Sequence, residues 1–482
     1  MAEFASIDPR YRWAVSYLRA LIQAPPGPPP GTPPEVVQER ARQRLERLRS
    51  FLAFFGEPHR AYPVVHVTGT SGKGSTSAFI ASILHAAGYR VGLHISPYLQ
   101  VETEKLQIGD RLLPADRFAT YVAELDEAVR AWLAEGEDPL TYGEFWTALV
   151  FHTFRREAVD FAVVEVGVGG RFDLTNVVFP EVSVITTVGL DHVRTLGPTI
   201  RDIAWHKAGI IKPGRPAVTG VDDPDLLAII ADEARRNGAP LRVVLPGRDF
   251  TVNCEAGATF LVETRTGRRY RIGLGGRFQA HNAALASAAI RELGWPSERA
   301  EAAIAQGLAT ARFPGRFELV QERPMVVLDG AHNPQKLRAL LAALEDLPRA
   351  ARRIAIFGVL DGHDAEEMAR LLAERVDLVF TAAPEATLRT AADPTALAVL
   401  FERLGTPAVP MRCVEEAVDV ALEVARSDDL VLVTGSLYLV GQARERWYPS
   451  AEIVRQRTCW PERTNGTVRQ AGTVCGEGSN TV

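Results

Sequence analysis

Residues 64–76 combine an apolar strand pattern with a glycine-rich turn, a lysine and two hydroxyl groups. Three glycines let the backbone turn sharply and bring its N–H groups close to a bound phosphate. The lysine can reach the outer phosphates, and the hydroxyl pair opens a helix whose N-terminus favours negative charge. The segment therefore predicts a loop that binds a nucleoside triphosphate. The residues expected to contact the nucleotide are Gly69, Thr70, Ser71, Gly72, Lys73, Gly74, Ser75 and Thr76.

This segment departs from the general phosphate-binding loop, which has Gly, four residues and then Gly-Lys-Ser/Thr. Val67 stands at the first glycine of that pattern, and Gly74 separates Lys73 from Ser75. A plain glycine-rich turn between a strand and a helix is the alternative. The order of strand, glycines, lysine, hydroxyls and an amphipathic helix with an apolar face over residues 79–87 favours the phosphate loop.

Three further segments place polar side chains where an apolar strand ends. Glu165 closes the run 161–165, and such a carboxylate suits Mg²⁺ beside a triphosphate, since Mg²⁺ takes few carboxylates together with phosphate oxygens. His192 follows another strand, where it is equally compatible with a packed histidine and with a metal or phosphate ligand. Asp329 and His332 follow a third strand. They indicate either a polar ligand contact with proton handling, or a helix-capping acid and a surface histidine.

Two lysines flank the apolar stretch 208–211. Lys207 lies among apolar neighbours, and burial of a lysine lowers its pKa. Lys212 is instead a candidate for an ordinary solvated lysine. The pattern therefore singles out Lys207 as the chemically unusual member of the pair.

The elements that must position these residues alternate between short apolar strands and helical patterns. This alternation predicts an α/β protein: a P-loop-type, mostly parallel sheet domain, followed by a smaller Rossmann-like α/β domain. Residues 240–275 alternate differently and predict a small antiparallel insertion. The expected strands are 64–67, 90–95, 161–165, 182–188, 325–328, 353–357, 378–381 and 430–434. The expected helices are 75–88, 115–135, 143–156, 200–209, 334–345, 365–375, 394–403 and 415–426.

Composition shifts suggest the domain boundaries. A proline-rich run ends near residue 34, and a Phe-Pro-Gly sequence within 308–316 marks a hinge. Apolar content falls after about residue 450. We expect an N-terminal segment with a proline-rich loop, an ATP-binding domain, a C-terminal domain and a disordered tail, at residues 1–34, 35–310, 316–450 and 455–482.

The bulk properties exclude several classes of protein. The chain of 482 residues is 46% hydrophobic and has a formal net charge of -5, which gives no reason to expect nucleic acid or an anionic membrane as partner. No signal peptide and no apolar run long enough to cross a membrane are visible. The four cysteines form no Cys-x-x-Cys pair. We expect a cytoplasmic location.

Nine motifs follow one another in order along the chain, at residues 66–75, 94–99, 165–176, 190–192, 206–212, 282–286, 314–318, 329–334 and 435–441. Examples are Glu-Val-Gly-Val-Gly-Gly-Arg-Phe-Asp-Leu-Thr-Asn, from residue 165, and Asp-Gly-Ala-His-Asn-Pro, from residue 329. Together they resemble the folylpolyglutamate synthase / dihydrofolate synthase family of the Mur-ligase superfamily. The resemblance covers roughly residues 35–445.

The resemblance implies an ATP-dependent amide ligase. A carboxylate of dihydropteroate, or of a reduced folate's terminal glutamate, would take the γ-phosphate of ATP, and the amine of L-glutamate would attack the acyl phosphate. Lys73 would neutralise charge on the phosphates. Ser96, Glu165 and His192 would hold two Mg²⁺ ions, and a carbamylated Lys207 would help to position one of them. The resemblance also admits K⁺, and its members are typically monomers.

The remaining implied roles involve the nucleotide, the catalytic centre and the other substrates. Asn282 and Arg316 would contact the nucleotide, the latter from across the hinge. Asp329 and His332 would lie near the incoming glutamate and the phosphates, as catalytic residues together with Lys73 and Lys207. The residues implied in substrate binding are Asp173, in the pterin loop, Ser436 and Tyr438.

The chain departs from the family pattern at several positions. Ser71 replaces the usual asparagine of the phosphate loop, and Tyr98 stands where the family often has histidine. Phe278, just before Gln279, also stands where the family often has histidine. Gly143 replaces a common aromatic residue, which would enlarge the folate pocket. Gly362-His-Asp replaces Asp-Lys-Asp, which puts the handling of glutamate there in question.

Two other functions fit parts of the pattern. One is a related ligase that adds an amino acid to a cell-wall nucleotide precursor, and the other is a nucleotide-switched regulatory or binding protein. Asp173 in its glycine-rich loop argues for folate, and the Asp329–His332 motif argues for a ligase. The sequence leaves open which pterin is accepted, the preferred one-carbon form and the length of the glutamate chain. It also leaves open the oligomeric state and the roles of the proline-rich segment and the tail.

Overall fold

The computed structural model describes residues 7–22, 28–29, 31–255, 258–386 and 389–462. The chain divides into two compact units. Unit 1 comprises Met1–Gly273 and Arg277–Arg312, and unit 2 comprises Leu274–Gly276 and Phe313–Val482. The described part of the predicted N-terminal segment belongs to unit 1, and the main division falls inside the predicted hinge.

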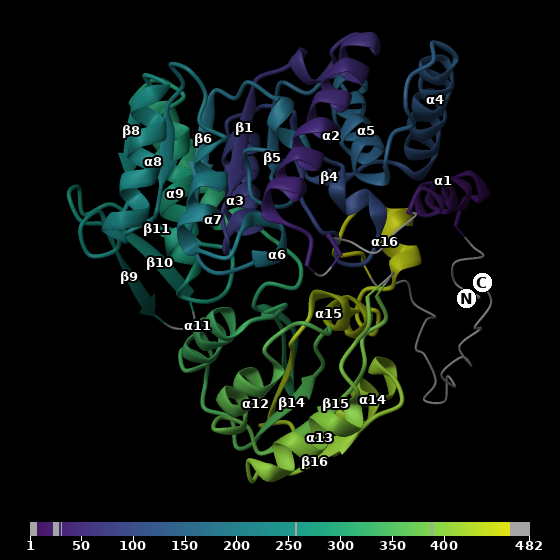
Figure 1. Cartoon of the computed structure of the whole chain (residues 1–482). Helices are drawn as coiled ribbons and strands as arrows, with labels where there is room; N and C mark the ends of the chain where they lie inside the picture. The colour runs from purple at the N-terminus through teal and green to yellow at the C-terminus, as the bar shows by residue number, and fades with distance from the viewer. Residues whose placement is uncertain (1–6, 23–27, 30, 256–257, 387–388, 463–482) are drawn as a thin grey trace. The chain divides into compact units, whose positions relative to one another are not determined.

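Unit 1 is built on an eight-stranded sheet with the order β4-β3-β2-β5-β1-β6-β7-β8 (Figure 1). The neighbouring strands β2, β5, β1, β6, β7 and β8 pair in parallel. At the other edge, β3 pairs antiparallel with both β2 and β4. The central strands are almost wholly apolar, as expected for strands covered on both faces. The predicted mostly parallel sheet is confirmed. Its strands are β1 (Val64–Thr68), β2 (Val91–His94), β3 (Gln107–Ile108), β4 (Arg111–Leu112), β5 (Phe161–Glu165), β6 (Val182–Ile185), β7 (Ala217–Thr219) and β8 (Leu241–Val243).

Helices cover this sheet, and α3 packs against β1, β2 and β5 on one side and against α9 and α10 on the other. The N-terminal helix α1 packs on α4, and α2 packs on α5. The α-helices of unit 1 are α1 (Pro9–Ala20), α2 (Pro34–Phe54), α3 (Lys73–Ala86), α4 (Ala115–Ala134), α5 (Tyr142–Arg156), α6 (Val193–Leu196), α7 (Ile200–Ala208), α8 (Pro224–Arg236), α9 (Gln279–Arg291) and α10 (Ser297–Thr310). Its described 3₁₀ turns are η2 (Pro58–Arg60), η3 (Glu102–Lys105) and η4 (Leu174–Val177).

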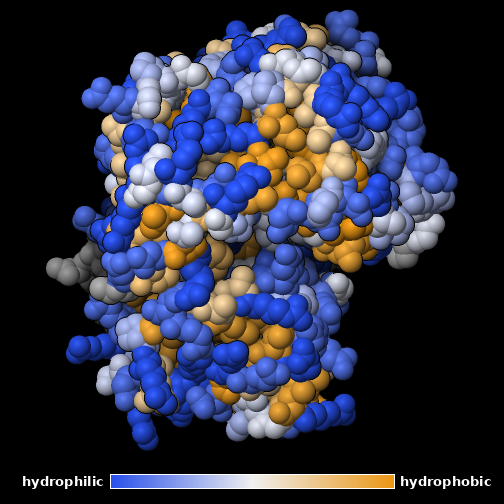
Figure 2. Space-filling model, turned by 90° about the vertical axis from the view of Figure 1, so that its left-hand side faces the viewer, coloured by the Kyte–Doolittle hydropathy of each residue, from blue (hydrophilic) through white to orange (hydrophobic). Residues whose placement is uncertain are grey.

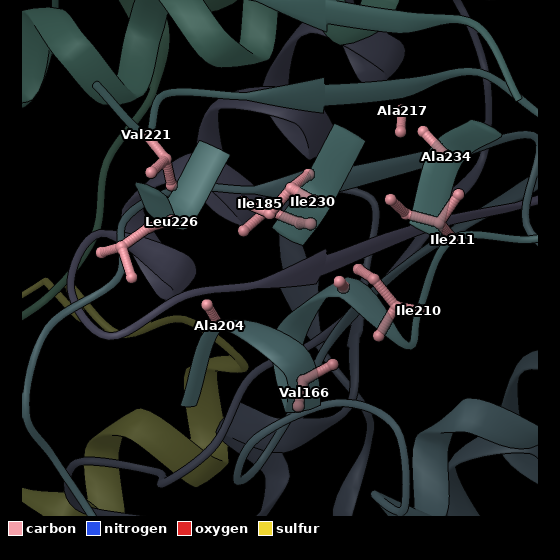
Figure 3. Packing of buried hydrophobic residues seen from close by; sticks show 11 residues of the cluster. Val166, Ile185, Ala204, Ile210, Ile211, Ala217, Val221, Leu226, Ile230 and Ala234 are labelled. Atoms are coloured by element: carbon pink, nitrogen blue, oxygen red, sulfur yellow. The ribbon is translucent and has the colours of Figure 1, made fainter. Parts of the chain in front are cut away.

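A buried apolar cluster fastens α7 and α8 to the sheet. Ile185 of β6 and Ile230 of α8 lie together at its centre in Figure 3, and both are fully buried. Ala204 of α7 and Ile210, just after that helix, complete the contact. Burying a side chain of this size contributes about 1.5–3 kcal/mol. The cluster therefore holds α7 rigidly behind the carboxyl ends of the central strands.

The predicted antiparallel insertion is present but shorter than expected. It is a three-stranded sheet of β9 (Phe250–Glu255), β10 (Ala258–Glu263) and β11 (Arg269–Ile272), in the order β11-β10-β9. Leu241–Val243, which the pattern placed in the insertion, pairs in parallel with β7 as the last strand of the main sheet. The alternation of apolar and charged residues had suggested a half-exposed hairpin strand, and a sheet-edge strand has the same pattern.

Unit 2 is a second α/β unit around a six-stranded sheet, in the order β12-β13-β17-β14-β15-β16. Only β12 is antiparallel to its neighbour. The strands are β12 (Glu318–Glu322), β13 (Met325–Leu328), β14 (Arg353–Phe357), β15 (Leu378–Thr381), β16 (Ala408–Pro410) and β17 (Leu430–Thr434). The helices are α11 (Pro334–Leu344), α12 (Ala365–Ala373), α13 (Pro394–Arg403), α14 (Val414–Val424), α15 (Leu437–Arg444) and α16 (Ser450–Gln456).

The chain stays folded beyond the predicted end of unit 2, so the prediction of a disordered tail from residue 455 is wrong for residues 455–462. Arg444 is fully buried, and its guanidinium donates to the Glu318 carboxylate at 2.9 Å and to the carbonyl of Cys459 at 2.6 Å. Trp460 Nε1 donates to the same carboxylate at 2.7 Å. These polar anchors replace the apolar content on which the prediction relied. Residues 463–482 lie outside the described residues.

Hydrophilic side chains surround smaller hydrophobic groups on the face drawn in Figure 2. Across the described ranges, none of the helices has the length and apolar character needed to cross a membrane.

The buried Arg444–Glu318 pair gives a first prediction. Arg444→Met leaves the Glu318 carboxylate without its main partner and should destabilise unit 2 by about 3–5 kcal/mol. The measurement is the urea concentration at which peptides of β12 and β13 lose protection from hydrogen exchange. The double variant Glu318→Gln/Arg444→Met removes the isolated charge and should recover part of the loss. Equal losses in both variants would show that the unpaired charge is not the cause.

Candidate active site

The loop between β1 and α3 has room only for glycine at two positions. Gly69 and Gly72 adopt φ values of 157° and 83°. A Cβ at Gly69 would lie 1.8 Å from Thr186 Oγ1, and one at Gly72 would lie 2.2 Å from Asn282 Oδ1. Lys73 begins α3, and its Nζ donates to the Gly69 carbonyl at 3.1 Å. The ammonium therefore folds back over the loop that precedes it.

The end of β6 fixes this loop in place. The Thr70 amide donates to the Thr187 carbonyl at 2.9 Å, and Thr70 Oγ1 bonds both the carbonyl and the amide of Gly189 at 3.0 Å. The Ser71 amide donates to Thr187 Oγ1 at 2.9 Å, and Thr186 Oγ1 donates to the Ser71 carbonyl at 2.6 Å. The protein's own hydrogen bonds thus determine the shape of the loop.

The first turn of α3 carries the predicted hydroxyl pair. Gly74 lies within this turn, and Ser75 and Thr76 are both buried. Thr76 Oγ1 donates to Asn282 Oδ1 at 3.4 Å, and Asn282 in turn donates to Gln279 Oε1 at 2.8 Å. The N-terminus of a helix presents unpaired N–H groups, so this turn can receive an anion. The structure therefore brings Asn282, from α9, to the phosphate loop.

Two of the three predicted metal ligands lie together. Glu165 ends β5, with Val67 of β1 as its register partner. Its carboxylate is buried, and Oε2 accepts a hydrogen bond from the Ser96 amide at 3.1 Å. Within the described residues, no three or more His, Cys, Asp or Glu side chains gather as a metal site. A metal here would therefore also draw on the Ser96 hydroxyl and on oxygens of a ligand.

The third predicted ligand, His192, is an accessible histidine in a strained backbone position. It lies between β6 and α6 with φ of 51°, a value that costs energy for a residue with a Cβ. Its Nε2 lies 3.8 Å from Asp191 Oδ1, and 43% of its side chain is exposed. Such exposure argues against the packed-histidine alternative. Whether His192 ligates a metal stays a prediction.

Lys207 is buried, as its apolar neighbours predicted. It lies on α7 and is 3% exposed. Thr199 and Asp202 form a capping box that starts this helix. The glycine-rich loop after β5 passes close to α7, since a Cβ at Gly170 would lie 3.2 Å from Lys207 Cα. Lys207 thus neighbours the loop that Glu165 begins.

Asp173 organises the same loop. Its Oδ2 accepts from the Val168 amide at 3.0 Å, and its Oδ1 accepts from the amide and the hydroxyl of Thr175 at 2.9 and 2.5 Å. Thr175 Oγ1 lies 2.9 Å from Nε2 of His66, on β1. Burial lowers the pKa of His66 to about 3, so the imidazole is neutral. The predicted contact of Asp173 with a substrate is untested, but its role in holding the loop is plain.

The pocket enlargement expected beside Gly143 is absent. A Cβ at this position would lie 3.0 Å from Arg44 Nη2 and 3.1 Å from Leu174 Cδ1. Arg44, on α2, also donates to Thr141 Oγ1 at 3.3 Å. The space of the missing side chain is therefore filled by a guanidinium and a leucine, which sequence reasoning did not anticipate.

Unit 2 holds Asp329 at the carboxyl end of β13. Its two carboxylate oxygens accept from the amides of Phe317 and Ala331, both at 2.8 Å. Burial raises the pKa of Asp329, against the opposing charges of Arg316 and Lys336. Asp329 therefore ties two loops together, and its predicted contact with the nucleotide stays a prediction. The helix-cap alternative for this acid is wrong, because Asn333 and not Asp329 caps α11.

His332 has both ring nitrogens engaged within unit 2. Its Nδ1 lies 2.9 Å from the Gly330 carbonyl, and its Nε2 lies 2.8 Å from Lys336 Nζ. Asn333 caps α11 by accepting from the Lys336 amide at 2.9 Å. This arrangement suits a residue that positions a ligand better than one that transfers protons. The predicted catalytic role of His332 remains untested.

The last predicted substrate contacts lie at the start of α15. Ser436 caps this helix, with its Oγ accepting from the Tyr438 amide at 3.2 Å. A Cβ at Gly330 would lie 2.2 Å from Leu437 Cδ2, so the start of α15 packs tightly on the loop after β13. Ser436 therefore has a structural function, and the substrate roles of Ser436 and Tyr438 stay predictions.

Sequence reasoning missed Glu104, which shapes the loop after Ser96. Glu104 is fully buried, and its carboxylate accepts from the amides of Leu99, Gln100 and Val101 at 2.6, 3.1 and 3.3 Å. Its acidic side chain in the connection between β2 and β3 was the only feature of the sequence that could have pointed to it.

A phosphate loop beside a buried acid, in an α/β unit followed by a second α/β unit, defines a Mur-type ligase. Protein-family comparison agrees, because residues 67–290 match the Mur ligase middle domain and residues 315–437 match the Mur ligase glutamate ligase domain. The chain belongs to the folylpolyglutamate synthase/dihydrofolate synthase family. The resemblance drawn from the motifs is confirmed, and the cell-wall ligase and switch alternatives lose their support.

Individual relatives agree with this assignment. A dihydrofolate synthase/folylpolyglutamate synthase of Escherichia coli is 35% identical over 401 residues, which cover 83% of this chain and 90% of that protein. A probable bifunctional folylpolyglutamate synthase/dihydropteroate synthase of Haloferax volcanii is 36% identical over 413 residues. That match covers 83% of this chain but 48% of the relative, so the chain spans about half its length. The structure of E. coli FolC in complex with DHPP and ADP matches with a TM-score of 0.74 and 32% identity, over 91% of this chain and 97% of that one.

The tight fit of Gly72 gives a second prediction. Gly72→Ala should weaken ATP binding by about a hundredfold or more, because its Cβ would push Asn282 out of place and bend the loop. The measurement is a calorimetric titration with Mg-ATP. Gly88→Ala is the matched control, since Gly88 has a similar φ of 90° and a Cβ added there would meet nothing within 4 Å. Equal affinities in the two variants would contradict the role assigned to Gly72.

Proposed function

We propose that this protein is an ATP-dependent ligase that adds L-glutamate to dihydropteroate, to a reduced folate, or to both. The observation that carries the proposal is the phosphate loop, held in shape by the end of β6 and lying beside buried Glu165, which bonds the Ser96 amide. Membership of the folylpolyglutamate synthase/dihydrofolate synthase family supports the choice of substrates. A monomeric state and a cytoplasmic location remain predictions.

The reaction has two steps. The pterin substrate's carboxylate attacks the γ-phosphorus of ATP, which forms an acyl phosphate and releases ADP. The neutral amine of L-glutamate then attacks the acyl carbon, an amide forms, and inorganic phosphate leaves. Lys73 and the N-terminus of α3 would stabilise the negative charge that develops on the phosphoryl oxygens. Asn282 would help to orient the nucleotide, because it touches the loop directly.

The donors around Glu165 fit Mg²⁺. A carboxylate and a hydroxyl are hard oxygen ligands, which Mg²⁺ prefers together with phosphate oxygens and water. Bound there, Mg²⁺ would neutralise phosphate charge. We assign Ser96, Glu165 and His192 to two such ions. Lys207 fits carbamylation, because it is a buried lysine beside the loop that Glu165 begins. K⁺ stays a weaker expectation.

The proposal also gives roles to unit 2. Arg316 and Asp329 would contact the nucleotide. The residues that would contact L-glutamate are His332, Ser436 and Tyr438. The guanidinium of Arg316 lies 5.3 Å from the centre of the Phe313 ring and donates to the Gly315 carbonyl at 3.1 Å, so its position is defined. Asp173 would face the pterin from the loop that it organises.

The decisive experiment measures ADP release with Mg-ATP and L-glutamate, in the presence of either 7,8-dihydropteroate or tetrahydrofolate, with product masses read in parallel. ADP and a glutamylated product with both pterins would establish a bifunctional enzyme, and product with one would assign a single activity. Release that neither pterin stimulates would refute the proposal. Lys73→Ala should abolish turnover, since it removes the loop's only ammonium. Near-normal turnover in that variant would remove the phosphate-loop assignment.

A separate prediction concerns the metal. Glu165→Gln keeps the size of the side chain and still accepts from the Ser96 amide, but it loses the negative charge. We expect the Mg²⁺ concentration for half-maximal activity to rise by about tenfold or more. Asp160→Asn, before the opposite end of the same strand, is the control and should leave it unchanged. An unaltered Mg²⁺ requirement in Glu165→Gln would exclude Glu165 as a ligand.

A further inference from the structure

Lysine is rare in this chain, and every lysine lies at a sheltered position. Among the 54 basic residues there are 49 arginines and five lysines: Lys73, Lys105, Lys207, Lys212 and Lys336. All five are described, and none is exposed, whereas exposed arginines are numerous. A guanidinium is a planar fork, and an ammonium is a compact point charge.

Four of these lysines have an account. Lys73 and Lys207 belong to the proposed ATP and metal sites. Lys105 Nζ lies 4.1 Å from the centre of the Trp146 ring, and Lys212 Nζ donates to the Asn176 carbonyl at 3.3 Å, so the expectation of a solvated Lys212 is wrong. Burial lowers the pKa of each of these two to about 8. Lys336 remains, on the first turn of α11 beside His332.

The hydrogen bonds of His332 fix its tautomer. A carbonyl oxygen only accepts, so the contact of Nδ1 with the Gly330 carbonyl places the ring proton on Nδ1. An ammonium only donates, so the Nε2 lone pair faces Lys336 Nζ at 2.8 Å. His332 is therefore a neutral imidazole, and Lys336 carries the positive charge of the pair. An ammonium has three N–H groups and can donate to a second acceptor at the same time.

Lys336 and Arg316 supply positive charge beside Asp329 and His332 in unit 2. The His363 ring packs edge-on against His332, with ring centres 5.5 Å apart. His363 belongs to the segment Gly362-His-Asp, so this segment, His332 and Lys336 form one group of residues. Arg316 and Lys336 both act electrostatically on Asp329. The N-terminus of α11 adds a partial positive charge.

We propose that Lys336 binds a carboxylate of the incoming L-glutamate, and that it holds His332 in the tautomer and orientation that complete this subsite. The inference rests on the proposed function and adds a residue to it. L-Glutamate reacts through its amine, so both of its carboxylates stay available for binding throughout the reaction. His332 and the Asn333 cap hold Lys336 in a defined position, which lowers the cost of ordering its ammonium around a carboxylate.

The first test is steady-state kinetics of the full chain with whichever pterin it accepts. Lys336→Met should raise KM for L-glutamate by about tenfold or more, since a charge-assisted hydrogen bond is lost, and should leave KM for ATP within about twofold. Lys336→Arg should restore little, because a planar fork cannot serve His332 and a carboxylate in the same geometry. The matched control is Arg338→Met, two residues along on the same helix, which removes an exposed cation paired with Glu367. It should leave both values unchanged.

Two kinetic outcomes would overturn the proposal. One is a KM for L-glutamate that stays within about twofold of the parent in Lys336→Met. The other is a rise in KM for ATP with no change for L-glutamate, which would assign the ammonium to a phosphate.

A second test does not depend on turnover. In the full chain labelled with ¹⁵N-histidine, the signal of His332, assigned through His332→Gln, should show the Nδ1–H tautomer. L-glutamate should shift it in the parent and not in Lys336→Met. If no pterin is glutamylated, the proposed function fails, and this titration still decides the subsite. The absence of a shift with L-glutamate, or a shift with inorganic phosphate at lower concentration, would overturn the assignment.

Discussion

The hydrogen bonds between the phosphate loop and the end of β6 are the constraint on which the rest of unit 1 depends. The loop has no room for a Cβ at Gly69 or Gly72, because Thr186 and Asn282 already occupy that space. Its amides and hydroxyls bond residues 186–189, so two neighbouring strands of the sheet fix one another's ends. A site of this kind is preorganised, which lowers the cost of ordering charged groups around a nucleotide.

The same strand ends gather the other residues of unit 1. Thr68, at the end of β1, donates to the Gly169 carbonyl at 2.6 Å, which links the phosphate loop's strand to the glycine-rich loop after β5. That loop carries Asp173 and passes against α7 near Lys207. Apolar residues of the same helix, Ala204 and Ala208, pack in the buried cluster that includes Ile185 and Ile230 (Figure 3). Glycines that allow close contact and buried hydroxyl groups that bond neighbouring loops thus hold the polar residues of unit 1 in defined positions.

Much of this could be predicted from the sequence, because period and motif carry the information. Apolar runs located the central strands, and the glycines, Lys73 and Glu165 marked a loop and a strand end that the structure places on neighbouring strands. The misses have physical causes. Apolar and charged residues alternate in Leu241–Val243. An edge strand of a sheet and a hairpin strand share this pattern, so the sequence could not tell them apart. Residues 457–462 fold because Arg444 and Glu318, distant in sequence, meet in the interior. Arg44 fills the space beside Gly143 from another helix, and no local pattern reports such a contact.

The sheltered lysines have a consequence for chemical probing. Reagents that acylate amines would find few accessible side chains on the native protein, although its surface is rich in arginine. A protease that cleaves only after lysine would likewise need local opening at the phosphate loop, at η3, at α7 and the residues after it, or at α11 before it could cut. Cleavage after Lys73, Lys207 and Lys336 would therefore report on local opening of the proposed binding sites, while trypsin would cut mainly at the arginine-rich surface.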